Sequence, residues 1–274
     1  MIPEPIDRRG FLARGVGLAA GLAAWAAAAP RACAEPESGF RPSSHGFAFV
    51  NSFEGVPLPR SIREGQGLLA RALRAGLKGE LPSTFGLCGG MSLAAADYYH
   101  ANIKPPADTK PPKQGTPLYE YLYQRQTDSL GENVVMAAKF LQWMTLPDAG
   151  EGSCEAMSRE ELKGVPDRLM KGELVPLGLS LVRAKGNASS DAPEGLPWQN
   201  HQVLAYRWEA GPEFAHFWIY DPNHPHDDSV RLVNLAAGSA VPARHGYELR
   251  WGDRSRPVRG VFPMPYEPKR PPKL

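Results

Sequence analysis

The chain has 274 residues, of which 42% are hydrophobic, and its formal net charge at pH 7 is +2. No basic block with interleaved aromatic residues is present, which argues against a nucleic-acid partner. About 240 residues, the length left after an N-terminal leader, suffice for one sizeable core or two small lobes. We expect no cofactor.

The first 34 residues are predicted to be a targeting segment. Asp7-Arg8-Arg9-Gly10-Phe11-Leu12 precedes a mild apolar run from residue 15 to 29, which is shorter than the roughly 20 apolar residues that span a bilayer. The pattern resembles a twin-arginine export signal with cleavage after Ala34. It implies export in the folded state by the twin-arginine machinery, a domain over 35–274, and a soluble periplasmic or secreted product. The alternatives are a frayed Ala-rich helix and a lipid anchor on Cys33.

Loss of that segment removes four of 31 basic and two of 29 acidic residues, so that 27 of each remain. The mature chain is therefore formally neutral. Its cysteines are then Cys88 and Cys154 alone, too few for a disulfide scaffold. Either the two pair as a single bridge, or Cys88 is a working thiol and Cys154 an ordinary buried one.

The first half of the mature chain is predicted to be mainly helical. Capping boxes at Ser61–Glu64 and Ser158–Glu161 indicate two helix starts, with Gly79 and Gly172 just beyond the respective helix ends. The other predicted elements are a strand over 47–53, a helix from Cys88 to about His100, a Pro-rich loop over 102–117, and helices over 118–126 and 132–144.

The second half is predicted to consist of strands. Gly, Pro and Asn turns separate six runs, over 174–182, 201–208, 214–220, 229–235, 247–251 and 259–262. A helical half followed by an antiparallel half indicates an α+β fold with two lobes. The cysteine lies in the first half and a histidine, His201, in the second, so a cleft between lobes is the expected site.

Cys88 is the candidate nucleophile. A thiol at a helix N-terminus is next to free backbone N–H groups and the positive end of the helix dipole, which favour its anionic form. Gly89 and Gly90 are interpreted as leaving the approach to the sulfur uncrowded.

His201 and Asp221 are the candidate base and its orienting acid. They lie on two predicted strands joined by a short link at Gly211-Pro212, and antiparallel pairing sets residues opposite when their numbers sum to about 422. That register makes His201 and Asp221 cross-strand neighbours, within reach of a carboxylate–imidazole hydrogen bond. Asn223 is the reserve orienting residue, and Cys, His and Asp together supply a nucleophile, a base and an orienting group.

The strings Cys88-Gly89-Gly90-Met91-Ser92-Leu93, Asn200-His201-Gln202-Val203-Leu204 and Ile219-Tyr220-Asp221-Pro222-Asn223 resemble the papain-like cysteine peptidases, and in particular the double-glycine leader peptidases. The resemblance covers residues 80 to 235 and implies a papain-like two-lobed fold with Cys88 as nucleophile, His201 as general base and Asp221 as its orienting residue. In that family a glutamine about six residues before the cysteine helps to bind the oxyanion. Here the nearest polar side chains are Ser83 and Thr84.

The sequence therefore predicts an exported cysteine hydrolase, peptidase or amidase, or an acyl transferase. Its substrate would be a peptide, an amide or a partner protein. The missing glutamine favours a second interpretation, a papain-like fold that works as a binding or scaffold protein. A third is a metal site among His216, His224, His226, Asp227 and Asp228, but this spacing matches no metal motif, and no metal ligand is predicted.

Overall fold

A computed structural model describes residues 38–54, 84–131, 135–211, 214–235 and 246–273. All of them lie in one compact unit, Pro36–Leu274. The predicted export signal, the helix from Ser61 to Gly79 and Ser83 lie outside the described residues. Within the described part of the chain, no helix combines the length and the apolar composition needed to cross a membrane.

Helices dominate the first half of this unit, as predicted. After the short α1 (Pro42–His45), the helices are α4 (Cys88–His100), α5 (Pro117–Ser129), α6 (Val135–Thr145), α7 (Cys154–Glu161) and α8 (Val165–Met170). Residues 103–116 are a loop, as the prolines indicate. Pro166 lies in the first turn of α8, where a missing N–H costs nothing.

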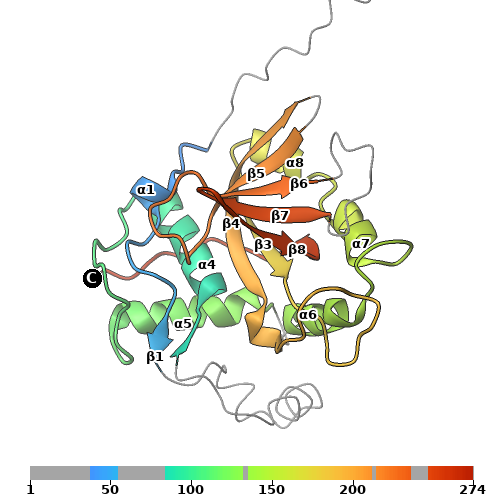
Figure 1. Cartoon of the computed structure of the whole chain (residues 1–274). Helices are drawn as coiled ribbons and strands as arrows, with labels where there is room; N and C mark the ends of the chain where they lie inside the picture. The colour runs from blue at the N-terminus through green and yellow to red at the C-terminus, as the bar shows by residue number, and fades with distance from the viewer. Residues whose placement is uncertain (1–37, 55–83, 132–134, 212–213, 236–245, 274) are drawn as a thin grey trace, which may run out of the picture. The chain divides into compact units, whose positions relative to one another are not determined.

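The second half is a seven-stranded antiparallel sheet that curls (Figure 1). In sheet order, its strands are β8 (Arg254–Val258), β7 (Tyr247–Trp251), β6 (Arg231–Asn234), β5 (Phe214–Tyr220), β4 (His201–Gly211), β3 (Val175–Ser180) and β9 (Gly260–Pro263). A separate two-stranded sheet pairs β1 (Phe53–Glu54) with β2 (Thr84–Phe85), immediately before α4. The described fold is thus mixed helix and antiparallel sheet.

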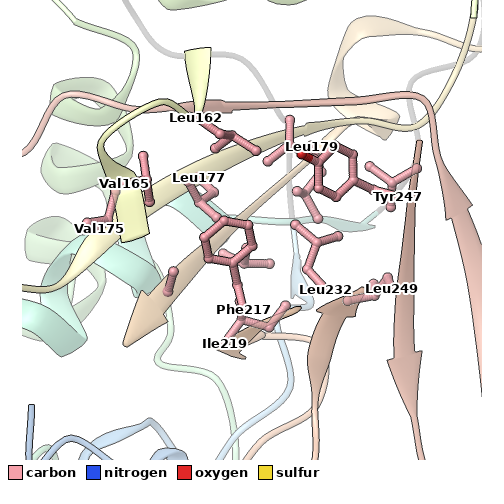
Figure 2. Close-up of a cluster of buried hydrophobic side chains, with 14 of the residues drawn as sticks. Leu162, Val165, Val175, Leu177, Leu179, Phe217, Ile219, Leu232, Tyr247 and Leu249 are labelled. Atoms are coloured by element: carbon pink, nitrogen blue, oxygen red, sulfur yellow. The ribbon is translucent and has the colours of Figure 1, made fainter. Parts of the chain in front are cut away.

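Two large apolar clusters fix the helices to the sheet. One joins α8 to the sheet through residues such as Val165, Leu177 and Phe217, which face one another in Figure 2. The other joins α4 and α5 to β4 and β5, with Met91, Leu122, Leu204 and Tyr220 among its members. Because α4 packs directly on β4, the start of the helix and the start of the strand are held in fixed positions relative to each other.

A buried charge cluster also ties α4 to α5 and to the C-terminal segment. Arg125 of α5 pairs with Asp97 of α4 at 2.7 Å between Nε and Oδ2, and its Nη2 donates to the carbonyl of Glu267 at 2.9 Å. Asp97 accepts in turn from the backbone N–H of Lys269 at 2.8 Å. A buried carboxylate and guanidinium need such partners, and here the partners come from three segments.

Two predictions about elements were wrong, and one strand was missed. Residues 47–53 are not a strand, since only Phe53 pairs, and Phe47 and Phe49 are buried in the cluster with α4. Ser158 does not begin a helix: α7 begins at Cys154 after the N-cap Ser153, and Ser158 Oγ donates to Cys154 O within the helix. β8 was not predicted at all.

Candidate active site

Cys88 is the first residue of α4, and its side chain is partly exposed. The predicted helix start is therefore confirmed. No side chain caps this N-terminus at Leu87, and the first N–H groups of a helix have no intrahelical partners. Cys88 thus lies at the N-terminus of a helix, the end that favours a negative charge.

Gly89 and Gly90 serve close packing of the head of α4. A Cβ at Gly90 would lie 2.1 Å from the carbonyl oxygen of Leu122 on α5. A Cβ at Gly89 would lie 2.3 Å from Ser129 Oγ and 2.5 Å from Gln202 Oε1. The glycines let the head of α4 press against α5 and β4, which places Cys88 at the start of β4.

His201 and Asp221 form a buried pair. His201 is the first residue of β4, Asp221 follows the last residue of β5, and His201 Nε2 lies 2.7 Å from Asp221 Oδ1. The backbone N–H of Asn223 donates to the same Asp221 oxygen at 2.8 Å. The structure thus brings together two of the side chains that the sequence singled out.

The predicted register of the β4–β5 hairpin was wrong, although the predicted contact is present. Pairing begins with Gly211 opposite Phe214, shifts at a bulge between Ala205 and Arg207, and ends with Leu204 opposite Tyr220. Continued to His201, this pairing reaches Asn223, two residues beyond Asp221. Residues two apart share a face of a strand, so His201 and Asp221 are diagonal neighbours.

The electrostatics of the pair favour an imidazolium. Burial by itself lowers the pKa of His201, but the charge and hydrogen bond of Asp221, with a further contribution from Cys88, outweigh it and raise that pKa to about 10. Burial raises the pKa of Asp221, and the charge and hydrogen bond of His201 more than offset this, so the net direction is downward. Since Nε2 is engaged by Asp221, Nδ1 is the ring nitrogen left to face the Cys88 thiol.

The other predicted side chains lie in different places. Asn223 Nδ2 is 3.3 Å from His201 Nε2, so the reserve orienting residue also borders the imidazole. Thr84 is exposed on β2 opposite Glu54. Among the residues that the structure describes, no hydrogen bond joins Thr84 to Cys88.

Cys154 is a buried, inert thiol. Both Cys88 and Cys154 are free, and Cys154 Sγ lies 3.4 Å from the carbonyl oxygen of Trp143. Burial raises the pKa of Cys154 to about 11. Of the two alternatives for the cysteines, the structure therefore shows the unbridged one.

Four of the five side chains in the metal interpretation have partners of other kinds. His216 Nε2 lies 3.4 Å from Glu209, and the ring of His224 packs against Trp251. Asp227 accepts from the backbone and hydroxyl of Ser229, and Asp228 accepts from Ser43. Among the residues that the structure describes, no group of three or more His, Cys, Asp or Glu side chains is placed to hold a metal ion.

Two further side chains hold the site, and the sequence did not single them out. The Oδ1 atom of Asn51 accepts from the backbone N–H of Leu87 at 2.6 Å, directly before Cys88. The Oε1 atom of Gln126 accepts from the backbone N–H of Gly90 at 3.0 Å. An amide side chain that binds a distant backbone group leaves no signal in sequence spacing.

No family model, curated protein or solved structure matches this chain.

Proposed function

We propose that this protein is a papain-like cysteine hydrolase or acyl transferase that uses Cys88, His201 and Asp221. The observation that carries the proposal is the buried His201–Asp221 pair, at 2.7 Å, with Cys88 at the head of α4 contributing to the pKa of the same imidazole. A nucleophile beside a base, itself oriented by a third group, is the arrangement that covalent acyl transfer requires.

The resting state of this mechanism is a thiolate–imidazolium pair. At neutral pH a His201 pKa of about 10 keeps the ring protonated, with Nε2–H donating to Asp221 and Nδ1–H to the sulfur. The positive ring and the helix N-terminus both stabilise the anionic sulfur. Asp221 is buried and keeps the ring in one orientation.

In the first half of the reaction, the Cys88 sulfur forms a bond to the acyl carbon of the substrate, and the carbonyl electron pair moves to oxygen. The backbone N–H of Cys88 stabilises that oxyanion. When the intermediate collapses, the bond to the leaving group breaks and His201 Nδ1 gives its proton to the leaving atom. The products are a thioester and a neutral imidazole.

In the second half, water or another acceptor attacks the thioester carbon. His201 Nδ1 takes the proton of the attacking group, the carbon–sulfur bond breaks, and the thiolate–imidazolium pair is restored. Water yields an acid, whereas an amine or alcohol acceptor yields a new amide or ester. The substrate would thus be an amide or ester, with a peptide or partner protein as expected examples, and export would place this chemistry in the periplasm or outside the cell.

Alkylation with iodoacetamide at pH 6 tests the proposal, with the label located by mass spectrometry. At that pH roughly one ordinary thiol in 300 is ionised. We expect Cys88 in the folded protein to react at least tenfold faster than Cys88 in the same chain unfolded in urea. Cys154 should stay unlabelled until the protein unfolds, because its side chain is buried.

Two variants identify the cause of that reactivity. His201→Ala should bring the labelling rate of folded Cys88 at pH 6 down to that of the unfolded chain. His216→Ala, in which another partly buried strand histidine is lost, should leave the rate unchanged. Equal labelling of Cys88 in folded and unfolded wild-type protein would reject the enzyme and favour the binding or scaffold interpretation.

A further inference from the structure

A chain of amide side chains connects the segment before Cys88 with the imidazole of His201. We propose that Asn51, its central member, is a positioning residue that holds the nucleophile in register with the base. The inference rests on the proposed function, because it assigns a further residue to the same site. Asn51 Oδ1 accepts from Leu87 N–H at 2.6 Å, and Asn51 Nδ2 donates to Asn223 Oδ1 at 3.2 Å.

The direction of this chain follows from chemistry. The N–H of Leu87 can only donate, so the oxygen of the Asn51 amide must face it and the nitrogen must face Asn223. The Asn223 oxygen is then occupied, which leaves its nitrogen on the side of His201, 3.3 Å from Nε2. A donor cannot receive the Nε2 proton. Asp221 is therefore the acceptor that orients the ring, and Asn223 confines it from the side.

Asn51 also joins the two segments through its backbone. Its N–H donates to the carbonyl oxygen of Pro222 at 3.0 Å, so one residue contacts the chain just before Cys88 and the chain just after Asp221. These segments are far apart in sequence. The packing of α4 on β4 brings the sulfur near the imidazole, and the relative position of these two segments adjusts that distance. A pair that shares a proton must stay within hydrogen-bond reach.

The packing around Asn51 leaves it little freedom. A Cβ at Gly86 would lie 2.6 Å from Asn51 Nδ2, so the main chain at 86 passes directly over the amide. The pairing of Phe53 with Phe85 holds the same stretch from the other side. With the amide removed, the β1–β2 sheet still anchors Phe85 and the Asn51 backbone still bonds Pro222, but Leu87 N–H loses its side-chain link to Asn223.

The test compares Asn51→Ala with two other variants. For each protein, the alkylation rate of Cys88 at pH 6 is divided by the rate at pH 10, where an ordinary thiol ionises without help. We expect Asn51→Ala to lower this ratio about tenfold, which is the effect of about 1.4 kcal/mol on the thiolate–imidazolium pair. The rate at pH 10 should stay within about twofold of wild type.

Asn51→Asp is the conservative variant. A carboxylate keeps an acceptor for Leu87 N–H, and the Asn223 amide turns to donate to its second oxygen. For Asn51→Asp, the ratio of the Cys88 alkylation rates at pH 6 and pH 10 should lie within about threefold of the wild-type ratio. Asn187→Ala is the matched control, since Asn187 also bonds several backbone groups, at Met144, Leu146 and Ser189, and none of them belongs to the site.

The outcomes separate the inference from the proposed function. A fast wild-type Cys88 with an unchanged ratio in Asn51→Ala would overturn the positioning role and leave the enzyme proposal intact. An equal fall of the ratio in Asn187→Ala would also overturn it, because general destabilisation would then be the cause. A wild-type Cys88 that labels no faster folded than unfolded would overturn both.

Discussion

Replacement of Asp221 by asparagine separates the charge of this residue from its shape. Oδ1 would still accept from His201 Nε2 and from the backbone N–H of Asn223, as it does in the wild type. The new amide nitrogen would take the place of Oδ2, which is buried and has no hydrogen-bond partner in the described structure. Leaving that donor unsatisfied costs about 1–3 kcal/mol of folding stability.

The expected effect on the imidazolium is larger. A His201 pKa of about 10, against an ordinary value of 6.5, corresponds to roughly 5 kcal/mol in favour of the protonated ring at 1.36 kcal/mol per pH unit. Without the carboxylate charge, burial dominates and lowers the pKa of His201. In Asp221→Asn the ring should therefore be neutral at pH 7, and Cys88 should label at least tenfold more slowly at pH 6.

NMR titration of the His201 ring protons checks the pKa, and alkylation checks the consequence. Asp228→Asn is the control, since Asp228 is an exposed carboxylate that accepts from Ser43. A variant in which His201 still titrates above pH 8, or in which Cys88 labels at the wild-type rate, would refute the reasoning that Asp221 holds the proton on the ring.

The same pair makes stability depend on pH. The pKa of His201 is raised on folding, so its contribution is complete below about pH 6.5 and is lost as the pH rises towards 10. The pKa of Asp221 is lowered on folding, so its contribution is present above about pH 4 and is lost on further acidification. Thermal unfolding should show the largest gap between wild type and Asp221→Asn from about pH 4 to 6.5.

Two predictions concern the frame around the site. Gly90→Ala should destabilise the fold by about 1–3 kcal/mol in urea unfolding, because the added Cβ would meet the Leu122 carbonyl. Gly39→Ala is the control and should leave stability unchanged, because Gly39 is exposed and the nearest atom to an added Cβ is 3.6 Å away. Equal stability of the two would contradict the close α4–α5 packing. Arg259→Met should lower the free energy of unfolding by about 3–5 kcal/mol, because Arg259 donates to Asp148 and to three backbone carbonyls. A loss below about 1 kcal/mol would show that this buried pair is dispensable.

The elements that sequence predicted best are those with a simple period. The strands at 175–180, 214–220 and 247–251 stand out because apolar side chains recur between turn residues. β8 was missed because its sequence, Arg254-Ser-Arg-Pro-Val258, is that of a polar edge strand. Residues 47–53 were misread because their aromatic side chains are buried by irregular chain, and burial rather than strand pairing explains the pattern.

Sequence signals for a helix start predicted the correct residue only where a single start was possible. Cys88–His100 was predicted correctly because Gly-rich chain leads into an Ala-rich run. At α7 two serines compete for the N-cap, and Ser153, which accepts from Ala156 N–H, begins the helix in place of Ser158. Ser158 is buried and its hydroxyl also accepts from Val261 N–H at 2.8 Å, a tertiary contact that no local pattern contains.

The meeting of His201 and Asp221 depends on one irregularity that spacing does not reveal. If the pairing that starts at Gly211 and Phe214 continued without a bulge, His201 would lie opposite His224. Asp221 is three residues from that position and would point to the other face of the sheet. The bulge between Ala205 and Arg207 moves the partner of His201 to Asn223, and Asp221 then shares its face. The single extra residue in β4 is therefore what places the carboxylate on the imidazole, and it belongs to the site as much as the side chains do.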